Sequence, residues 1–207
     1  MFVSNVNSLK PSSEYPDLAF KYVDPKRYAY LKDLIEKYIT KEDKILNVGC
    51  GTSRLGEDLS EEGYEDITNI DFSQTVITLM EEKYRETFPK MTFRKMDVLN
   101  MNAFQDEMFN TIFDKGTLDA VMCSDNFVVD SHRMISEIYR VLKPGGRYIC
   151  ITYGDPEHRK KHFEIKKWDK IVTEKIQKPA TSNKETKVPE GERTFHYMYI
   201  LTKKKEA

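Results

Sequence analysis

The stretch ILNVGCGTS, residues 45–53, decides how the rest of the chain is interpreted. Four residues suited to a buried strand run directly into Gly-Cys-Gly and then into two hydroxyl side chains. Gly49 and Gly51 lack a Cβ, so the chain can turn sharply there and a ligand can approach the backbone closely. A tight turn without a ligand is the alternative, and the glycine pair alone does not separate the two.

Strand-like runs and helical patterns alternate around this turn. One helical stripe precedes it in residues 26–39; two follow, one with Ser73 as its N-cap and one ended by KPGG at 143–146. Such alternation predicts parallel strands with right-handed crossovers, hence an α/β fold with a doubly wound, seven-stranded, mostly parallel sheet. The expected strands are 44–48, 67–71, 92–97, 109–114, 147–153, 168–177 and 194–202.

The last two expected strands have no helix between them, which predicts a hairpin. We expect 168–177 to run parallel to the first five strands and 194–202 to be the antiparallel last strand. The polar segment between them, 178–193, is predicted to be a mobile loop. The whole chain, 1–207, is predicted to be one domain that begins with an irregular arm over residues 1–20.

Composition excludes several classes of protein. Hydrophobic residues make up 39% of the 207 residues, which is enough for a core, but no run approaches the roughly 18 apolar residues of a membrane span. The first residues lack the pattern of a signal peptide. The three cysteines have no metal-ligand spacing. These features predict a reduced, cytoplasmic protein without a membrane partner or a metal site.

The net charge of −1 hides an asymmetry between the two ends of the chain. Residues 143–207 carry 16 Lys and Arg against 9 Asp and Glu, so this part is basic. A solvated lysine-rich edge is the simpler interpretation, because unclustered charges rarely form a specific site. Binding of a nucleic acid is therefore not expected, although the charge balance leaves it open.

Acidic residues at two further strand ends indicate a nucleoside ligand. Asp71 lies 20 residues beyond Gly51, where a carboxylate can accept both hydroxyls of a ribose. Asp97 and Val98 close the third strand and can recognise an adenine edge. A dinucleotide site would need a third glycine where this chain has Arg54. S-adenosylmethionine has no pyrophosphate and tolerates that residue, so it is the predicted cofactor and a dehydrogenase is the weaker alternative.

Several motifs, in order, resemble the class I S-adenosylmethionine-dependent methyltransferases, whose fold is Rossmann-like. They are NVGCGTS, NIDFS, KMDVLNM, FDKGTLDAV, ISEIYRVLKPGGRYICIT and the closing hairpin. Within that superfamily, DKGTLDA, PEHRKKHF and FHYMYIL resemble the eukaryotic lysine methyltransferases that modify translation elongation factor 1-alpha. The resemblance implies a protein-lysine methyltransferase with that factor as a candidate partner.

The resemblance also implies roles for single residues. Gly49 and Gly51 would line the methionine part of the cofactor, and Asp71 would hold its ribose. The other implied cofactor residues are Phe72, which would pack on the adenine, Asp97 and Val98 at the adenine edge, Lys115, and Tyr22, which would cover the cofactor. The family's tryptophan motif near the N-terminus is missing, because the chain's one tryptophan is Trp168.

Methyl transfer needs little from side chains beyond positioning and exclusion of water. A lysine acceptor must lose a proton first, and Asp119 is the candidate catalytic residue that could take this proton or orient the amine. The absence of an N/D-P-P-Y/F motif argues against amide- or adenine-directed transfer. Three alternatives remain: a small-molecule acceptor, an RNA acceptor, and a cofactor-binding scaffold without activity.

Overall fold

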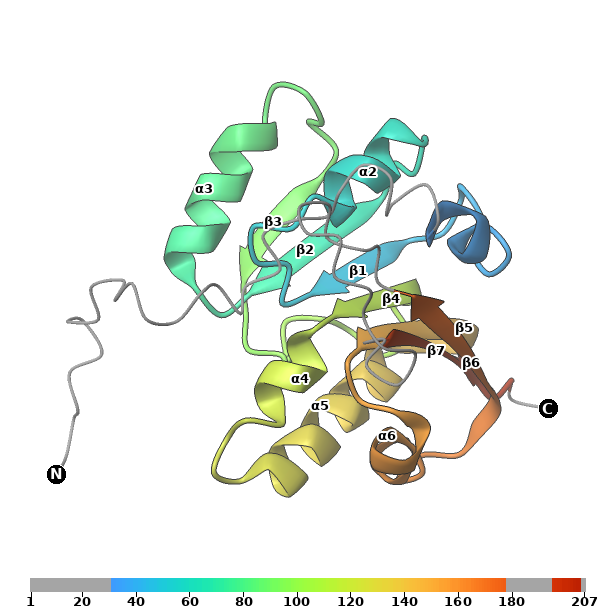
Figure 1. The fold of residues 1–207 in the computed structure, drawn as a ribbon. Coiled ribbons are helices and arrows are strands. Elements are labelled where there is room, and N and C mark those ends of the chain that lie inside the picture. Colours follow the sequence, from blue (N-terminus) through green and yellow to red (C-terminus); the bar gives the residue numbers. More distant parts are fainter. Residues whose placement is uncertain (1–30, 178–194, 206–207) are drawn as a thin grey trace, which may run out of the picture.

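A seven-stranded sheet forms the centre of the molecule (Figure 1). The structure is a computed structural model, and it describes residues 31–177 and 195–205. The strands lie in the order β3-β2-β1-β4-β5-β7-β6. Their bounds are β1 Ile45–Val48, β2 Ile67–Asp71, β3 Thr92–Lys95, β4 Phe109–Lys115, β5 Leu142–Thr152, β6 Trp168–Gln177 and β7 Phe195–Lys203.

The pairing confirms the predicted strand directions. Strands β1 to β5 are paired in parallel. Strand β7 is antiparallel to both β5 and β6, so β6 runs in the same direction as the first five strands. Val48 lies opposite Ile70 on one side and Asp114 on the other, which brings the carboxyl ends of three strands to one edge of the sheet.

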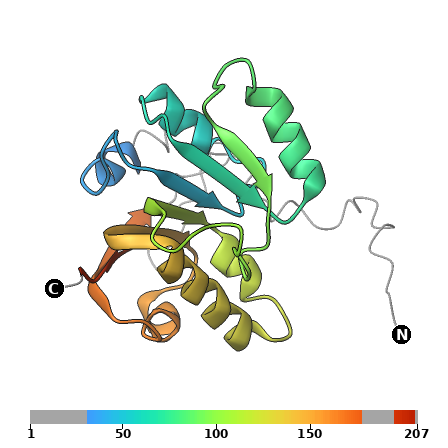
Figure 2. The ribbon, with the colours of Figure 1, turned by 180° about the vertical axis from the view of Figure 1, so that it is seen from behind.

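Helices cover both faces of the sheet (Figures 1 and 2). Successive residues of one strand point to opposite faces of the sheet. Leu46 and Ile112 accordingly belong to one hydrophobic cluster, and Ile45 and Phe113 belong to the other. The first cluster packs against α4, α5 and α6, and the second against α2, α3 and residue Ile35. The helix bounds are α2 Leu55–Glu61, α3 Gln74–Tyr84, α4 Thr117–Val121, α5 Phe127–Val141 and α6 Pro156–Phe163, and residues 31–35 are also helical.

The ends of several elements follow local chemistry. Ser73 is the N-cap of α3, as predicted, because its Oγ accepts a hydrogen bond from Val76 N at 3.3 Å. Helix α5 ends at Val141, and the chain is already extended at Leu142, which pairs with Phe109. Strand β5 therefore includes the KPGG segment and begins five residues before the predicted start at 147.

Some predictions fall outside the described residues. They are the arm over 1–20, the beginning of the predicted helix at 26–39, Tyr22 and the connection 178–193. Within the described ranges, no helix is both long and apolar enough to cross a membrane.

Candidate functional site

Two adjoining cavities lie at the carboxyl ends of the parallel strands. Their volumes are about 440 and 470 Å³, and both are lined by Gly49, Lys115, Gly116 and Ala120. The first cavity extends over Asp71, Phe72, Asp97 and Val98, and the second over residues 50–53, Asp119, Cys123 and Tyr153. All predicted site residues within the described ranges therefore line one of two connected spaces.

The glycine turn after β1 packs against the start of helix α4 and also lines the cavities. Gly49 and Gly51 both have positive φ angles, +58° and +51°. A Cβ on Gly49 would collide with the side chain of Thr117, whose Oγ1 donates a 2.8 Å hydrogen bond to Val48 O. A Cβ on Gly51 would meet no atom within 4 Å. Gly49 is thus needed for close packing, and Gly51 leaves open space beside the second cavity.

Asp71 ties two backbone segments together at the end of β2. Its Oδ2 accepts a hydrogen bond from Gly51 N and its Oδ1 accepts one from Ser73 N, each at 2.9 Å. The carboxylate thereby fixes the glycine turn relative to the start of α3. Burial, with the Asp71 charge nearby, raises the pKa of the Cys50 thiol to about 12, so this thiol stays neutral at pH 7 and serves packing.

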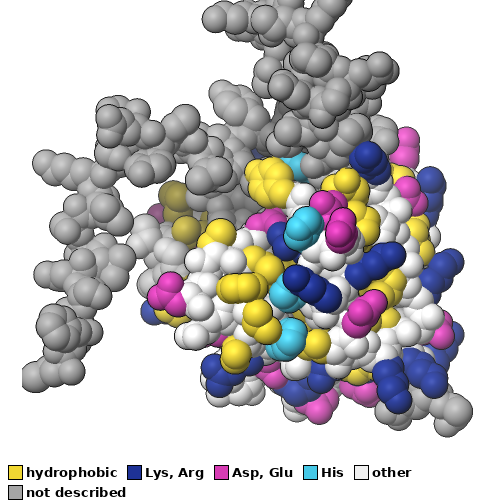
Figure 3. Space-filling model, turned by 60° about the horizontal axis from the view of Figure 1, so that its bottom comes forward, with side chains coloured by type: hydrophobic (Ala, Val, Ile, Leu, Met, Phe, Trp, Pro, Cys, Tyr) yellow, Lys and Arg dark blue, Asp and Glu magenta, His cyan; other side chains and the backbone are white. Residues whose placement is uncertain are grey.

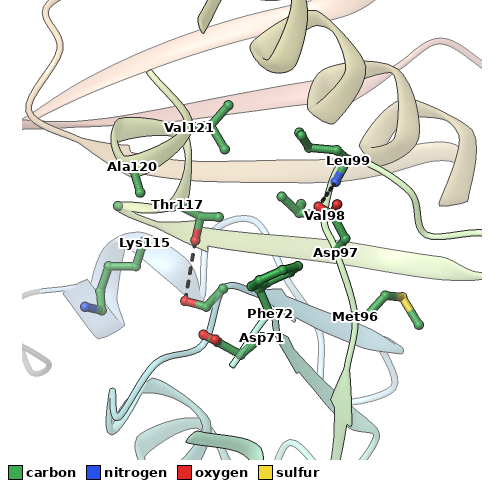
Figure 4. Close-up of a pocket in the computed structure, with 12 residues that line it drawn as sticks. Asp71, Phe72, Met96, Asp97, Val98, Leu99, Lys115, Thr117, Ala120 and Val121 are labelled. Carbon is green, nitrogen blue, oxygen red and sulfur yellow. Dashed lines mark hydrogen bonds between the residues drawn. The ribbon is translucent and has the colours of Figure 1, made fainter. Parts of the chain in front are cut away.

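The first cavity has the features of an adenosine site. Phe72 exposes 72% of its surface although it follows a buried strand, and Figure 4 shows its ring between Thr117 and the Asp97–Val98 segment. Asp97 Oδ1 accepts a 2.9 Å hydrogen bond from Leu99 N, which holds this segment in a tight turn. The exposed Phe72 ring, which lies between the carboxylates of Asp71 and Asp97, is suited to pack on an adenine ring whose ribose is held by Asp71.

The second glycine-containing turn, after β4, is fixed by a buried carboxylate. Asp114 is fully buried and accepts hydrogen bonds from Tyr148 Oη at 2.7 Å and Thr117 N at 2.8 Å, with Leu118 N at 3.2 Å. Burial raises the pKa of Asp114 to about 6, although these hydrogen bonds favour the charged form. Gly116, with φ of +84°, allows the chain to turn over this carboxylate.

Asp119 lies in the second cavity and is paired with α6. Its Oδ1 accepts hydrogen bonds from Arg159 Nη2 and Thr152 Oγ1, and its Oδ2 accepts one from Tyr153 N at 3.3 Å. The side chains of Asp119 and Arg159 are 16% and 10% exposed, so this ion pair is largely shielded from water. The arrangement joins α4, the end of β5 and α6.

These residues fit the predicted cofactor better than a dinucleotide. A pyrophosphate at the glycine turn would need the Gly51 amide, which already donates a 2.9 Å hydrogen bond to Asp71 Oδ2, and a third glycine where this chain has Arg54. The nearest basic residue in sequence, Arg54, is directed to Glu57, with Nε 3.0 Å from Oε2. A cofactor without phosphate groups meets neither obstacle.

Comparison with known proteins agrees with this geometry. The methyltransferase domain family matches residues 39–204. The chain belongs to this family. It contains a methyltransferase domain, as the motifs predicted, and it has the predicted fold.

Several curated proteins are similar to this chain over most of its length. The human eEF1A lysine and N-terminal methyltransferase is 38% identical over 184 residues, which cover 85% of this chain but 25% of the relative. The mouse EEF1A lysine methyltransferase 4 is 33% identical over 150 residues, 69% of this chain and 58% of the relative. The chain thus spans about a quarter of the length of the first relative.

Solved structures share the fold of this chain. A Methanosarcina mazei S-adenosylmethionine-dependent methyltransferase has a TM-score of 0.61 and 19% identity, with 84% of this chain and 98% of that chain covered. The Haemonchus contortus phosphoethanolamine N-methyltransferase 2 has a TM-score of 0.68 and 14% identity, with 89% and 54% covered.

Sequence reasoning missed two charged residues that shape the candidate site. Asp114 and Arg159 hold the turn after β4 and the end of β5, but their side-chain partners Tyr148 and Asp119 are 34 and 40 residues away. The one available signal for Asp114 was a carboxylate at the end of a predicted buried strand. The individual roles of the predicted cofactor residues and of Asp119 remain predictions.

Proposed function

We propose that this protein is an S-adenosylmethionine-dependent methyltransferase that transfers methyl groups to a lysine side chain of a protein, with translation elongation factor 1-alpha as the first candidate. The observation that carries the proposal is the second cavity, which continues past the shared glycine turn to Asp119 and Tyr153 and offers space for an acceptor. The names of the relatives supply the candidate. The name of the human relative includes N-terminal methylation. The mouse relative, of which this chain covers the larger share, is named for lysine methylation alone.

The proposed division of the site follows the two cavities. Asp71, Phe72, Asp97 and Val98 would hold the adenosine part of the cofactor in the first cavity. Gly49, Gly51 and Lys115 would hold its amino-acid part at the junction with the second. When bound there, S-adenosylmethionine supplies a methyl group on a sulfonium, which a neutral amine can attack. The residues that line the second cavity therefore have to position the acceptor and exclude water.

Asp119 is proposed to orient the acceptor amine. Asp119 is ion-paired with the Arg159 guanidinium, which is nine-tenths buried, and breaking such a pair is costly. Its Oδ1 already accepts two hydrogen bonds, while its Oδ2 accepts one weaker bond from Tyr153 N. Orientation through Oδ2 thus suits the geometry better than removal of the proton. Burial of the acceptor lowers the pKa of its amine and favours loss of that proton to water.

We also propose a cytoplasmic location and a protein acceptor instead of a nucleic acid. Cys50, Cys123 and Cys150 are all free thiols, as a reducing compartment permits. On the face shown in Figure 3, basic side chains are interspersed with acidic, hydrophobic and histidine side chains, whereas a nucleic-acid footprint is a basic patch or stripe. RNA and small-molecule acceptors become outcomes of the test.

The test offers the protein labelled cofactor and three acceptors: unmodified elongation factor 1-alpha made in bacteria, total RNA, and a metabolite extract. We expect label in the protein, and mass spectrometry should locate it on a lysine. Two matched substrates separate the kinds of amine, one with its N-terminus blocked and one with its lysines converted to homoarginine beforehand. Label that survives lysine blocking, or that enters RNA or metabolites alone, would contradict the proposal. A protein that binds the cofactor and labels nothing would be a scaffold.

A further inference from the structure

The chain segment that follows β5 is held by a network of side chains from α4 and α6. Arg159 of α6 is 9% exposed; its Nε donates a 3.0 Å hydrogen bond to Thr152 Oγ1, and its Nη2 pairs with Asp119 of α4. Thr152 Oγ1 in turn donates to Asp119 and accepts from Gly154 N at 3.0 Å. A buried guanidinium and a largely shielded carboxylate thus fix the turn on which Tyr153 lies.

Packing restricts this turn from two further sides. A Cβ on Gly154 would collide with the Arg159 guanidinium, so the guanidinium lies directly against the backbone. On the β7 side, Tyr199 Oη donates a 2.8 Å hydrogen bond to Gly154 O. With Tyr153 N bound to Asp119 Oδ2, the backbone of Tyr153 has little freedom to move.

The side chain of Tyr153 lines the second cavity. Its ring meets the ring of His196 edge to face, with centroids 4.7 Å apart and planes at 85°. His196 is 6% exposed, so this contact supports Tyr153 from the buried side. Tyr153 itself is 45% exposed and shares the cavity with Gly51, Asp119 and Cys123, but it does not line the adenosine cavity.

We propose that Tyr153 forms the acceptor-side wall of the site and recognises an alkylammonium group on an aliphatic stem. This inference rests on the proposed lysine methyltransferase function and adds a residue that selects the acceptor. The stem can pack on the ring, and an ammonium group is attracted to an aromatic ring. Arg159 is a positioning residue that acts through Asp119 and Thr152.

The first test compares Tyr153→Phe with Tyr153→Ala. The Phe variant keeps the ring and should retain a KM near that of the parent, whereas the Ala variant should raise KM for the protein acceptor about tenfold, the scale of a lost cation–π contact. Phe127→Ala is the matched control, because Phe127 is an exposed aromatic residue, 41% accessible, that lines neither cavity. Affinity for S-adenosylhomocysteine, measured by calorimetry, should stay nearly unchanged in all three variants.

The second test asks whether Arg159 acts through Tyr153. Arg159→Lys keeps the charge and loses the planar fork that reaches both Thr152 and Asp119. It should raise KM, and in a Tyr153→Ala background it should add little, because two residues in one network are not additive. A merely structural role would instead lower the melting temperature equally in both backgrounds and leave KM unchanged.

A measurement of binding, which needs no catalytic turnover, completes the design. Each variant is saturated with S-adenosylhomocysteine and titrated with unmodified elongation factor 1-alpha. Weaker binding to Tyr153→Ala than to Tyr153→Phe supports the inference. Equal KM and equal binding for the two variants would overturn it, as would an equal loss of cofactor affinity, which would place Tyr153 in the cofactor site. Parent protein that binds the cofactor but methylates no protein amine would overturn the proposed function and this inference together, a result visible before any variant is compared.

Discussion

Asp71 has two tasks at the scale of a single residue. The same carboxylate that would accept the ribose hydroxyls already accepts hydrogen bonds from Gly51 N and Ser73 N. A carboxylate has about four acceptor sites on its two oxygens, so both tasks can be met at once. The cofactor site and the glycine turn are therefore coupled through one side chain, and a substitution there should change both.

Asp71→Ala is expected to weaken cofactor binding and to lower stability. Loss of hydrogen bonds to a charged group should reduce affinity for S-adenosylhomocysteine by about 1.5–3 kcal/mol, roughly tenfold to a hundredfold. The melting temperature should fall as well, because two backbone amides lose their acceptor. Calorimetry and thermal unfolding measure the two effects, and Asp71→Asn, which keeps one acceptor oxygen, should lie between. Parent-like affinity in a folded Ala variant would mean that the ribose is held elsewhere.

Residues next to strand ends could be predicted from the sequence, and residues that act through distant partners could not. Gly51, Asp71 and Asp97 were found because parallel strands deliver their carboxyl ends to one edge. Arg159 was missed because its role depends on Asp119, 40 residues earlier in the chain. Only the folded arrangement of α4 and α6 brings this pair together.

Two turns interlock at the scale of elements. The turn after β1 and the start of α4 meet where Thr117 Oγ1 donates to Val48 O. Gly49 provides the space for this contact, and Asp114 holds the other side through Thr117 N. The wall shared by the two cavities is therefore already formed by contacts within the described chain.

Substitutions of single glycines should distinguish a glycine that is needed for close packing from one that leaves space for a ligand. Gly51→Ala and Gly63→Ala each add a Cβ at positive φ with no atom within 4 Å, so each should cost about 1–2 kcal/mol of stability. Gly49→Ala adds a collision with Thr117, which should cost about 1–3 kcal/mol more. Chemical denaturation measures these differences.

Cofactor affinity gives the second half of this prediction. Gly51→Ala should lower it, because the added Cβ enters the cavity, whereas Gly63→Ala should not, because Gly63 lines neither cavity. Equal affinity for the two variants would show that no ligand approaches Gly51 closely. Equal stability of Gly49→Ala and Gly51→Ala would mean that Thr117 moves aside at little cost.

Element prediction failed where the periodic signal was weak. Helix α6 was not predicted as a helix, because its sequence PEHRKKHF has little apolar periodicity. Its start is nevertheless encoded locally: Pro156 is in the first turn, and Asp155 Oδ1 accepts a 3.0 Å hydrogen bond from His158 N. Capping chemistry thus carried information that hydrophobic spacing did not.

At the scale of the whole molecule, the candidate site lies at one edge of the sheet, next to the two hydrophobic clusters on its faces. Alternation of strands and helices predicted the doubly wound sheet, because crossover rules leave few choices. The lack of a helix between the last two expected strands predicted the antiparallel last strand. The cavities lie where β1, β2 and β4 end, with the turn after β3 beside them. A ligand that fills both cavities would join segments from both halves of the parallel sheet.

Such a ligand should stabilise the molecule as a unit. A ligand that binds the native state alone adds about 2.7 kcal/mol at a concentration of 100 Kd. For a chain of this size, that corresponds to a rise in melting temperature of about 5–10 °C. S-adenosylmethionine and S-adenosylhomocysteine should both produce this rise, and NAD should not, because its pyrophosphate would need the Gly51 amide, which already donates a hydrogen bond to Asp71 Oδ2.

A scan that shows stabilisation by NAD and none by S-adenosylmethionine would contradict the assignment of both cavities. A rise that shrinks by about half or more in Asp71→Ala but persists in Tyr153→Ala would assign the first cavity to the cofactor and leave the far end of the second to the acceptor.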